Sequence, residues 1–306
     1  MKKIENISLV GTGAIGATYA GKLHEMSPNC LKVIVDRKRY ERYTDNGFNI
    51  NGKHYNFNYV LPEEKVQPAD LILVAVKYHD LGQAIDAVKH HVGEDTIILP
   101  LLNGISSEEI IGRVYGMDKL LYGICVAIDA VRNGNSITYT NSGKIFFGQD
   151  NNTVYTEKVE AVRELFERSG IQYMIPENML HSLWWKFMVN VGINQTSAIL
   201  GAPYGVFQKG KEVQLLMESV MREVIHLSQR IGIGLQESDM EEWYKVLATL
   251  SPEGKTSMLQ DIEAHRKTEV EMLAGTVCEL GRKYHLETPI NEALFQMIRT
   301  LEQMYL

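Results

Sequence analysis

The chain has 306 residues, which is enough for two hydrophobic cores. Hydrophobic residues make up 45% and charged residues 23%, close to the globular average, which excludes wholesale disorder. The formal net charge of −7 excludes the basic footprint of a nucleic-acid-binding protein. Three cysteines without a CxxC pair argue against a disulfide framework or a structural zinc site and fit a reducing cytosol.

The beginning of the chain is typical of a strand rather than of a signal peptide. The apolar run Ile4–Val10 is interrupted by Glu5 and Asn6 and leads into a glycine-rich turn. Nowhere do about 18 apolar residues follow one another, as a membrane span requires. We therefore expect a cytoplasmic protein that binds neither membranes nor nucleic acid.

The first half alternates short β-branched runs with helical patterns such as Ala14–Glu25. Such alternation predicts right-handed βαβ units and a mostly parallel sheet. The turn Asn133-Gly134-Asn135 predicts a hairpin, and the later strands are expected to extend or edge the same sheet. The predicted strands are Ile7–Val10, Lys32–Val35, Leu71–Val76, Thr96–Leu99, Tyr122–Val131, Ser136–Thr140 and Lys144–Gly148.

From Pro176 onward almost every pattern is helical, and the breaks between helices have turn compositions. The predicted fold is therefore α/β, with a Rossmann-type dinucleotide-binding domain over residues 1–176 and an all-α domain over residues 177–306. The predicted helices are Asn178–Ile199, Lys211–Ile231, Asp239–Leu250, Ser257–Tyr284 and Pro289–Met304.

A glycine-rich loop lies between the first predicted strand and the first predicted helix. The three glycines match G-x-G-x-x-G: the first permits the tight turn, the second admits a pyrophosphate, and the third lets helix and strand pack closely. Amides at the start of the helix would hold the anion. The alternative is a glycine-rich turn without a ligand. The loop consists of Gly11, Thr12, Gly13, Ala14, Ile15 and Gly16.

The residues after the second strand leave the choice of dinucleotide open. Asp36, 20 residues after Gly16, could bind the adenosine ribose 2′-hydroxyl and favours NAD. Arg37 and the two basic residues after it could instead bind the 2′-phosphate of NADP through charge-assisted hydrogen bonds. They could also form an exposed basic turn with no part in specificity.

Lys186, Asn190 and Asn194 follow one another at intervals of four residues in a strongly apolar segment. They share one face of the predicted helix, and we call them the polar stripe. Polar groups on a largely buried helix must be hydrogen-bonded or face a polar cavity, although an ordinary solvent-exposed face is the alternative. Burial disfavours the charged form of a lysine, so Lys186 is a candidate general acid for a carbonyl group.

These features together resemble the ketopantoate reductases (2-dehydropantoate 2-reductases), which pair a Rossmann domain with a helical domain. The resemblance extends over nearly the whole chain and depends on the order and spacing of several motifs. They are the glycine loop, Val76-Lys77, Leu102-Asn103-Gly104, the polar stripe, and Thr256-Ser257-Met258-Leu259-Gln260-Asp261 with Glu269 beyond.

The resemblance implies a role for each matching residue. Lys186 would donate the proton to the ketone oxygen, and Glu269 would bind the substrate hydroxyl. Asn103 would lie near the nicotinamide ribose and the substrate, and Lys77 near cofactor and substrate. Three further residues would hold the hydroxyl and carboxylate of the keto acid, namely Asn190, Asn194 and Ser257.

Each of these residues also has a purely structural interpretation. Ser257 with Gln260 fits a capping box, and Glu269 could belong to a solvated charged face. Asn103 and Gly104 are residues that favour a turn, and Lys77 could be an ordinary solvent-exposed side chain at the end of a strand. The histidines have no spacing that demands a metal, so no metal site is predicted.

The implied reaction is the NADPH-dependent reduction of ketopantoate to pantoate in pantothenate and coenzyme A biosynthesis. NADP(H) is favoured over NAD(H) as the cofactor, although Asp36 departs from that expectation. The alternatives are a reductase of another 2-keto acid on the same scaffold and a non-catalytic nicotinamide sensor. The long helices of the second domain could pack against a second copy as a homodimer.

Overall fold

The computed structural model describes residues 3–306. The chain divides into two compact units, one up to Leu180 and the other from His181. The division falls inside helix α6 (Met179–Val189), a few residues beyond the boundary placed at residue 176 from the sequence. Each unit is described by itself below.

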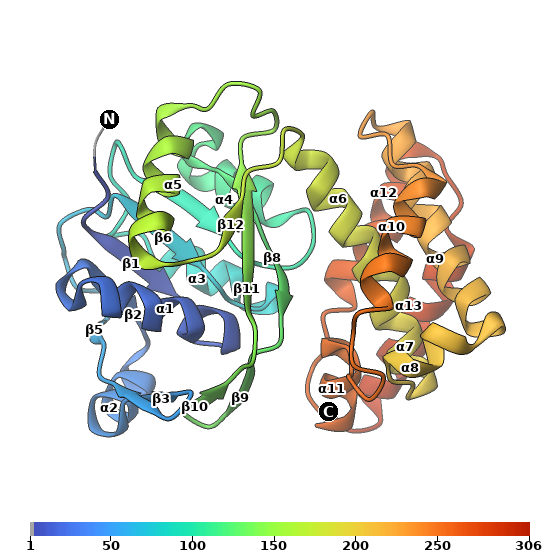
Figure 1. Cartoon of the computed structure of the whole chain (residues 1–306), viewed down its shortest axis with the longest axis horizontal. Helices are drawn as coiled ribbons and strands as arrows, with labels where there is room; N and C mark the ends of the chain where they lie inside the picture. Colours follow the sequence, from blue (N-terminus) through green and yellow to red (C-terminus); the bar gives the residue numbers. More distant parts are fainter. Residues whose placement is uncertain (1–2) are drawn as a thin grey trace. The chain divides into compact units, whose positions relative to one another are not determined.

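A five-stranded parallel sheet forms the centre of the first unit (Figure 1). The sequence predicts the parallel sheet and four of these strands, but not the short strand at residues 58–60. The strand order is β5-β2-β1-β6-β7, and every neighbouring pair is parallel, so all five strands end at one edge. We call this edge the carboxyl edge. The strands are β1 (Ile7–Val10), β2 (Leu31–Ile34), β5 (Asn58–Val60), β6 (Leu71–Val74) and β7 (Ile97–Pro100).

Alternate residues of these strands enter two separate hydrophobic clusters, because successive side chains of a strand point to opposite faces. On one face, Leu9 and Leu73 join the core with α1 and α5. On the other, Val10 and Val74 pack with α3 and α4. The sheet is therefore buried on both sides. Its helices are α1 (Ala14–Met26), α2 (Arg37–Asn46), α3 (Leu81–Ala87), α4 (Ser107–Tyr115) and α5 (Glu157–Ser169).

The later strands do not extend this sheet, contrary to the prediction. Together with β3 and β4, which lie earlier in the chain and were not predicted, they form two small sheets of their own, in the orders β4-β3-β10-β9 and β12-β11-β8. Leu120 makes only an isolated bridge to Ile98, and β7 ends at Pro100, which has no N–H group to donate to a further strand. The predicted hairpin turn does join β9 to β10. These strands are β3 (Phe48–Ile50), β4 (Lys53–Tyr55), β8 (Tyr122–Ile128), β9 (Val131–Asn133), β10 (Ser136–Thr138), β11 (Ser142–Gly148) and β12 (Tyr173–Met174).

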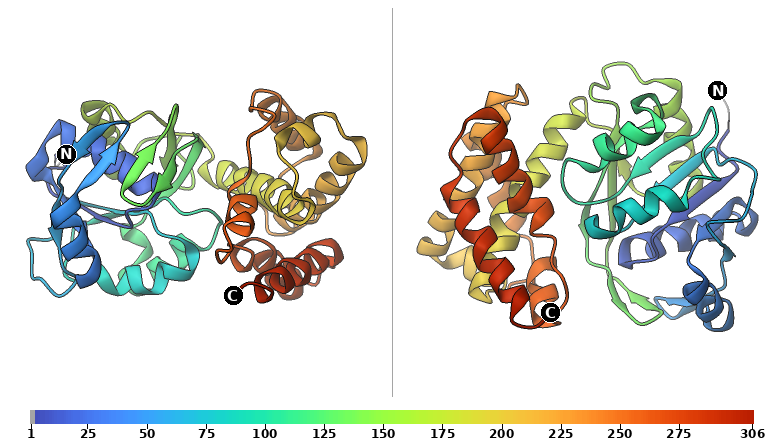
Figure 2. Two further views of the ribbon diagram at one scale, coloured as in Figure 1. Left: turned by 90° about the horizontal axis from the view of Figure 1, so that it is seen from below. Right: turned by 180° about the vertical axis from the view of Figure 1, so that it is seen from behind.

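The second unit is entirely helical in the part of the chain described (Figure 2). Within residues 3–306, no helix is both long enough and apolar enough to cross a membrane. Besides α6, the helices are α7 (Gln195–Leu200), α8 (Tyr204–Lys209), α9 (Lys211–Arg230), α10 (Glu237–Leu247), α11 (Ser257–Glu263), α12 (Thr276–Tyr284) and α13 (Pro289–Gln303).

Two of the predicted helices are interrupted. The first contains a π-helical turn, Asn190–Asn194 (η4), between α6 and α7. The segment Ser257–Tyr284 is not one helix: α11 ends near His265, whose φ of 51° is left-handed, and a second π-turn, Glu271–Gly275 (η5), precedes α12. The two π-turns pack against each other. Because π-turns occur frequently at functional sites, the contact between these two makes the region a candidate functional site.

Candidate active site

The glycine loop connects β1 to α1, and its outer glycines lack a side chain for a different reason from the middle one. A Cβ on Gly11, whose φ is +98°, would lie 2.3 Å from the Ala75 carbonyl oxygen. A Cβ on Gly16 would lie 2.0 Å from the Gly11 carbonyl oxygen. A Cβ on Gly13 would meet no protein atom closer than 4.0 Å. Packing therefore explains the outer glycines, whereas the open space at Gly13, beside the first amides of α1, fits the approach of a diphosphate.

Three predicted cofactor or substrate contacts come from neighbouring strands at the carboxyl edge. The glycine loop follows β1, Lys77 follows β6, and Asn103 follows β7. The segment at Ala75 lies directly against Gly11, so the loops after β1 and β6 are in contact. Lys77 and Asn103 are both half-buried. Ligands of open α/β sheets bind at this edge, so the fold places these residues where the sequence expects them.

Asp36 caps α2, and its carboxylate has protein partners. One oxygen accepts a hydrogen bond from the Arg39 amide at 2.8 Å, and the other lies 3.1 Å from the Arg39 guanidinium. Arg37 is exposed and forms an ion pair with Glu63 at 3.1 Å. The residue that suggested NAD and the residue that suggested NADP thus both have local structural roles.

The polar stripe crosses the first π-turn, a feature that the sequence analysis missed. Lys186 is on α6, and Asn190 and Asn194 are the first and last residues of η4. Over four residues, an α-helix rotates about its axis by roughly 40° more than one full turn, whereas the wider π-turn rotates by less than one full turn. The π-turn therefore rotates Asn194 back toward the line of Lys186. Lys186 and Asn190 are half-buried and Asn194 is buried, as expected for a helix that is apolar on its other faces.

The second group of predicted substrate contacts follows α10. Ser257 is exposed and is the first residue of α11. Its capping-box interpretation is wrong, because Thr256 caps this helix by accepting a hydrogen bond from the Leu259 amide at 3.2 Å. Glu269 is half-buried and precedes η5 in an irregular segment instead of lying within a long helix.

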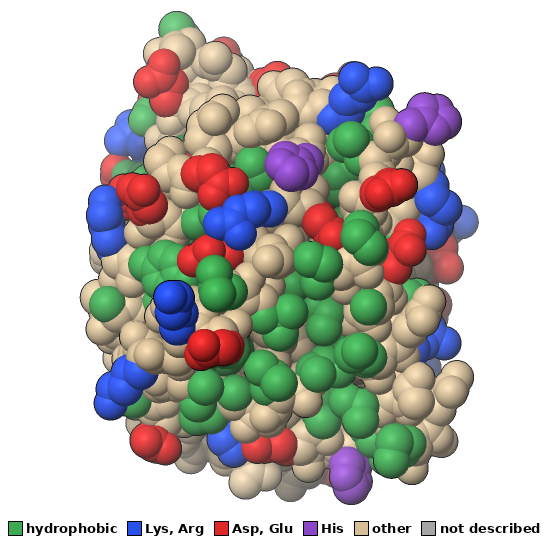
Figure 3. Space-filling model, turned by 90° about the vertical axis from the view of Figure 1, so that its right-hand side faces the viewer, with side chains coloured by type: hydrophobic (Ala, Val, Ile, Leu, Met, Phe, Trp, Pro, Cys, Tyr) green, Lys and Arg blue, Asp and Glu red, His purple; other side chains and the backbone are tan. Residues whose placement is uncertain are grey.

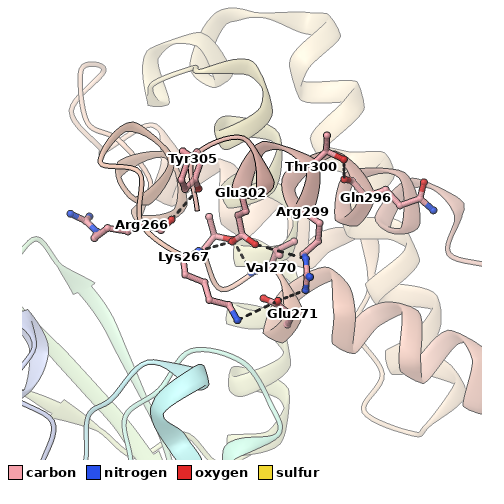
Figure 4. A network of polar contacts seen from close by, with 10 residues as sticks. Arg266, Lys267, Val270, Glu271, Gln296, Arg299, Thr300, Glu302 and Tyr305 are labelled. Atoms are coloured by element: carbon pink, nitrogen blue, oxygen red, sulfur yellow. Dashed lines mark hydrogen bonds and ion pairs between the residues drawn. The ribbon is translucent and has the colours of Figure 1, made fainter.

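A network of polar contacts fixes the segment that carries Glu269 (Figure 4). The Glu302 carboxylate, only 4% exposed, accepts hydrogen bonds from the Thr268 amide at 2.7 Å and the Thr268 hydroxyl at 2.6 Å. On the other side of Glu269, Glu271 pairs with Arg299 at 2.6 Å. Helix α13, through Glu302 and Arg299, therefore holds Thr268 on one side of the predicted catalytic carboxylate and Glu271, two residues after it, on the other.

Replacing Glu302 with alanine is expected to lower the free energy of unfolding by about 2–3 kcal/mol, because it leaves the buried Thr268 amide and hydroxyl without their charged acceptor. Chemical denaturation measures this change. Glu287→Ala, at an exposed position, is the control and should have little effect. Equal stability of the two variants would contradict the role of Glu302.

Glu108 is a buried carboxyl group that the sequence analysis did not identify. It lies in the first turn of α4, five residues after Asn103, and is 2% exposed. Its carboxylate accepts hydrogen bonds from the Ser107 hydroxyl at 2.9 Å and the Gly123 amide at 3.4 Å. Burial outweighs these bonds and raises the pKa of Glu108 to about 7. A single glutamate at the start of a helix gives no sequence signal of such burial.

The raised pKa of Glu108 makes stability depend on pH. Between its ordinary value of 4.5 and about 7, the folded state holds a proton that the unfolded state has released. The contribution of Glu108 to the free energy of unfolding is therefore greatest below this window and falls by about 3 kcal/mol as the pH rises through it. Chemical denaturation at pH 5 and pH 8 should show this loss in the wild type and a smaller loss in Glu108→Gln. Identical pH dependence in both proteins would contradict it.

The fold and the glycine loop define a Rossmann-type dinucleotide-binding class of protein with an added helical unit. In the part of the chain described, no group of three or more His, Cys, Asp or Glu side chains could hold a metal ion. The family models "Ketopantoate reductase PanE/ApbA" and "Ketopantoate reductase PanE/ApbA C terminal" match residues 7–152 and 178–302. The chain belongs to the ketopantoate reductase family of oxidoreductases.

Individual relatives are similar over almost their whole length. A 2-dehydropantoate 2-reductase of Pyrococcus horikoshii is 28% identical, over 97% of this chain and 98% of the relative. The solved structure of a D-mandelate dehydrogenase with NADH and anilino(oxo)acetate has a TM-score of 0.88 at 22% identity, covering 98% and 99% of the two chains. A dimeric ketopantoate reductase from Staphylococcus aureus has a TM-score of 0.82 at 20% identity, with the same coverage.

Proposed function

We propose that the protein reduces 2-dehydropantoate (ketopantoate) to pantoate with NADPH. The observation that carries this proposal is the polar stripe: a lysine and two asparagines in a segment, residues 183–198, whose other residues are all buried except Trp185. A protein that only senses a nicotinamide dinucleotide has no need of a proton donor on such a helix. Two further observations support the proposal: the chain belongs to a family of oxidoreductases, and its glycine loop is open to a dinucleotide.

The reduction adds a hydride to the ketone carbon and a proton to the ketone oxygen, and a bound nicotinamide supplies the hydride. The amides that begin α1 would hold the diphosphate of this cofactor, beside Gly13. Lys186 donates the proton from its Nζ to the ketone oxygen as negative charge develops there. Glu269 accepts a hydrogen bond from the substrate hydroxyl. The substrate carboxylate and hydroxyl are held by Asn190, Asn194 and Ser257.

A second candidate is the reduction of another 2-keto acid. It is favoured by the similarity to a D-mandelate dehydrogenase whose structure contains anilino(oxo)acetate. Loss of absorbance at the NADPH band with a panel of 2-keto acids separates the two. Ketopantoate should exceed every other keto acid in kcat/KM by more than tenfold, a difference of about 1.4 kcal/mol in transition-state binding. A preference for another acid would overturn the substrate, and no turnover with any acid would overturn the enzymatic function.

We also propose that the protein is a homodimer formed through its helical unit. Hydrophobic side chains gather on one face of this unit (Figure 3). Leu200, Leu215 and Met297 are each about half exposed. Apolar surface of this kind marks an association site. Light scattering should give twice the mass of one chain, and Met297→Glu should reduce it. A wild-type mass equal to that of one chain would contradict the proposal.

A further inference from the structure

Two arginines that the sequence analysis did not consider meet beside the glycine loop. Arg132, on strand β9, donates hydrogen bonds to the Thr12 carbonyl oxygen and, at 2.9 Å, to the Tyr43 hydroxyl. Arg42, on α2, donates to the same hydroxyl at 3.0 Å. The two guanidinium groups therefore lie within about 6 Å of each other, around a single phenol oxygen.

These charges have no acidic partner. Among residues 3–306, no carboxylate forms an ion pair with Arg42 or Arg132, although the nearby Arg37 and Arg39 each have one. Burial alone would raise the pKa of Tyr43, but hydrogen bonds from Thr12 and Arg132 and the charge of Arg132 outweigh burial and lower it. The region is therefore electropositive, and like charges held so close together favour an anion between them.

Arg132 keeps donors available for such an anion. Of its five N–H groups, three are used by the carbonyls of Gly134 and Thr12 and by Tyr43. Its guanidinium also lies over the Phe48 ring, 5.4 Å from the centroid, which restricts its orientation. The fold thus holds Arg132 in place with two N–H groups that these contacts do not use.

The position of the pair selects one phosphate of a dinucleotide. The diphosphate would be bound by the amides that begin α1, so it does not need the arginine pair. Thr12 lies between the first two glycines of the loop, and its hydroxyl is hydrogen-bonded to Tyr43. Arg42 and Tyr43 are on α2, the helix that follows β2. In Rossmann folds the adenosine ribose binds at the end of this second strand. We infer that Arg42 and Arg132 form the 2′-phosphate subsite and determine the preference for NADPH over NADH. This inference rests on the proposed nicotinamide cofactor.

Equilibrium binding of NADPH and of NADH, measured without any keto acid, tests the assignment. Arg132→Ala and Arg42→Ala should each weaken NADPH binding by about 10- to 100-fold, the value of a charge-assisted hydrogen bond, and change NADH binding less than about threefold. Arg37→Ala is the matched control, because Arg37 is an exposed arginine of the same helix paired with Glu63. It should change neither affinity.

Three results would overturn the inference: a wild type that binds both dinucleotides equally, equal weakening of both by the two variants, or selective weakening only in Arg37→Ala. Arg42 is exposed, and its side-chain hydrogen bond and its cation–π contact are both with Tyr43, so Arg42→Ala keeps the test valid if Arg132→Ala does not fold. Because no keto acid is present, a wild type that prefers NADPH but does not reduce ketopantoate refutes the proposed substrate and leaves this subsite standing.

Discussion

Replacing Lys186 with alanine is expected to lower kcat by about 10²- to 10⁴-fold, the usual contribution of a positioned general acid. The reduction places negative charge on the ketone oxygen, and the variant lacks the ammonium group that would protonate it. Affinity for NADPH should remain nearly unchanged, because the glycine loop belongs to the other unit. Steady-state kinetics with ketopantoate and direct NADPH binding measure the two quantities.

Lys211→Ala is the control for this experiment, since Lys211 is an exposed lysine at the start of α9 in the same unit. It should retain wild-type kcat. Wild-type turnover in Lys186→Ala would eliminate Lys186 as the proton donor. A rise in KM with kcat unchanged would instead mean that Lys186 binds the ground state and the transition state equally.

The sequence predicts four of the five central strands because their signals are local, whereas the three-residue strand β5 was not predicted. β1 was predicted with its observed bounds, and α1 to within one residue, because buried β-branched runs and a glycine turn are readable from adjacent residues. The separate small sheets were not predicted. Their pairing depends on partners far apart in the chain, such as β3 with β10, and on the end of β7 at Pro100.

The site shows the same limit. The glycine loop and the polar stripe follow from spacing, but the π-turn that realigns Asn194 has no signature in residue type. Arg132 and Thr12 are 120 positions apart, and only the fold brings them together. Asp36 and Arg37 are readable as candidates because they follow β2 directly, and the structure adds what the sequence does not show: Asp36 caps α2 and Arg37 pairs with Glu63. Their part in cofactor binding stays a prediction.

Replacing Gly13 with alanine is expected to weaken NADPH binding by about 100-fold or more while leaving the free protein about as stable as the wild type. The backbone of Gly13, at φ −65° and ψ −173°, is open to alanine, and the new Cβ would meet no protein atom closer than 4.0 Å. Alanine makes the unfolded chain less flexible than glycine does, which raises the free energy of unfolding by about 0.4–1 kcal/mol. This gain nearly cancels the loss that follows because alanine is a poorer helix N-cap than glycine. The added methyl group would instead occupy the space through which a diphosphate approaches the amides.

Gly16→Ala is the matched comparison, and it should behave in the opposite way. Its Cβ would lie 2.0 Å from the Gly11 carbonyl oxygen, a backbone atom that cannot move without breaking the turn. We expect a loss of about 1–3 kcal/mol in the free energy of unfolding, as for other overpacked sites. Thermal unfolding of the free proteins and titration with NADPH separate the two glycines. If Gly13→Ala bound NADPH as tightly as the wild type, the glycine loop would not be the diphosphate site, because no diphosphate could approach these amides past the new methyl group.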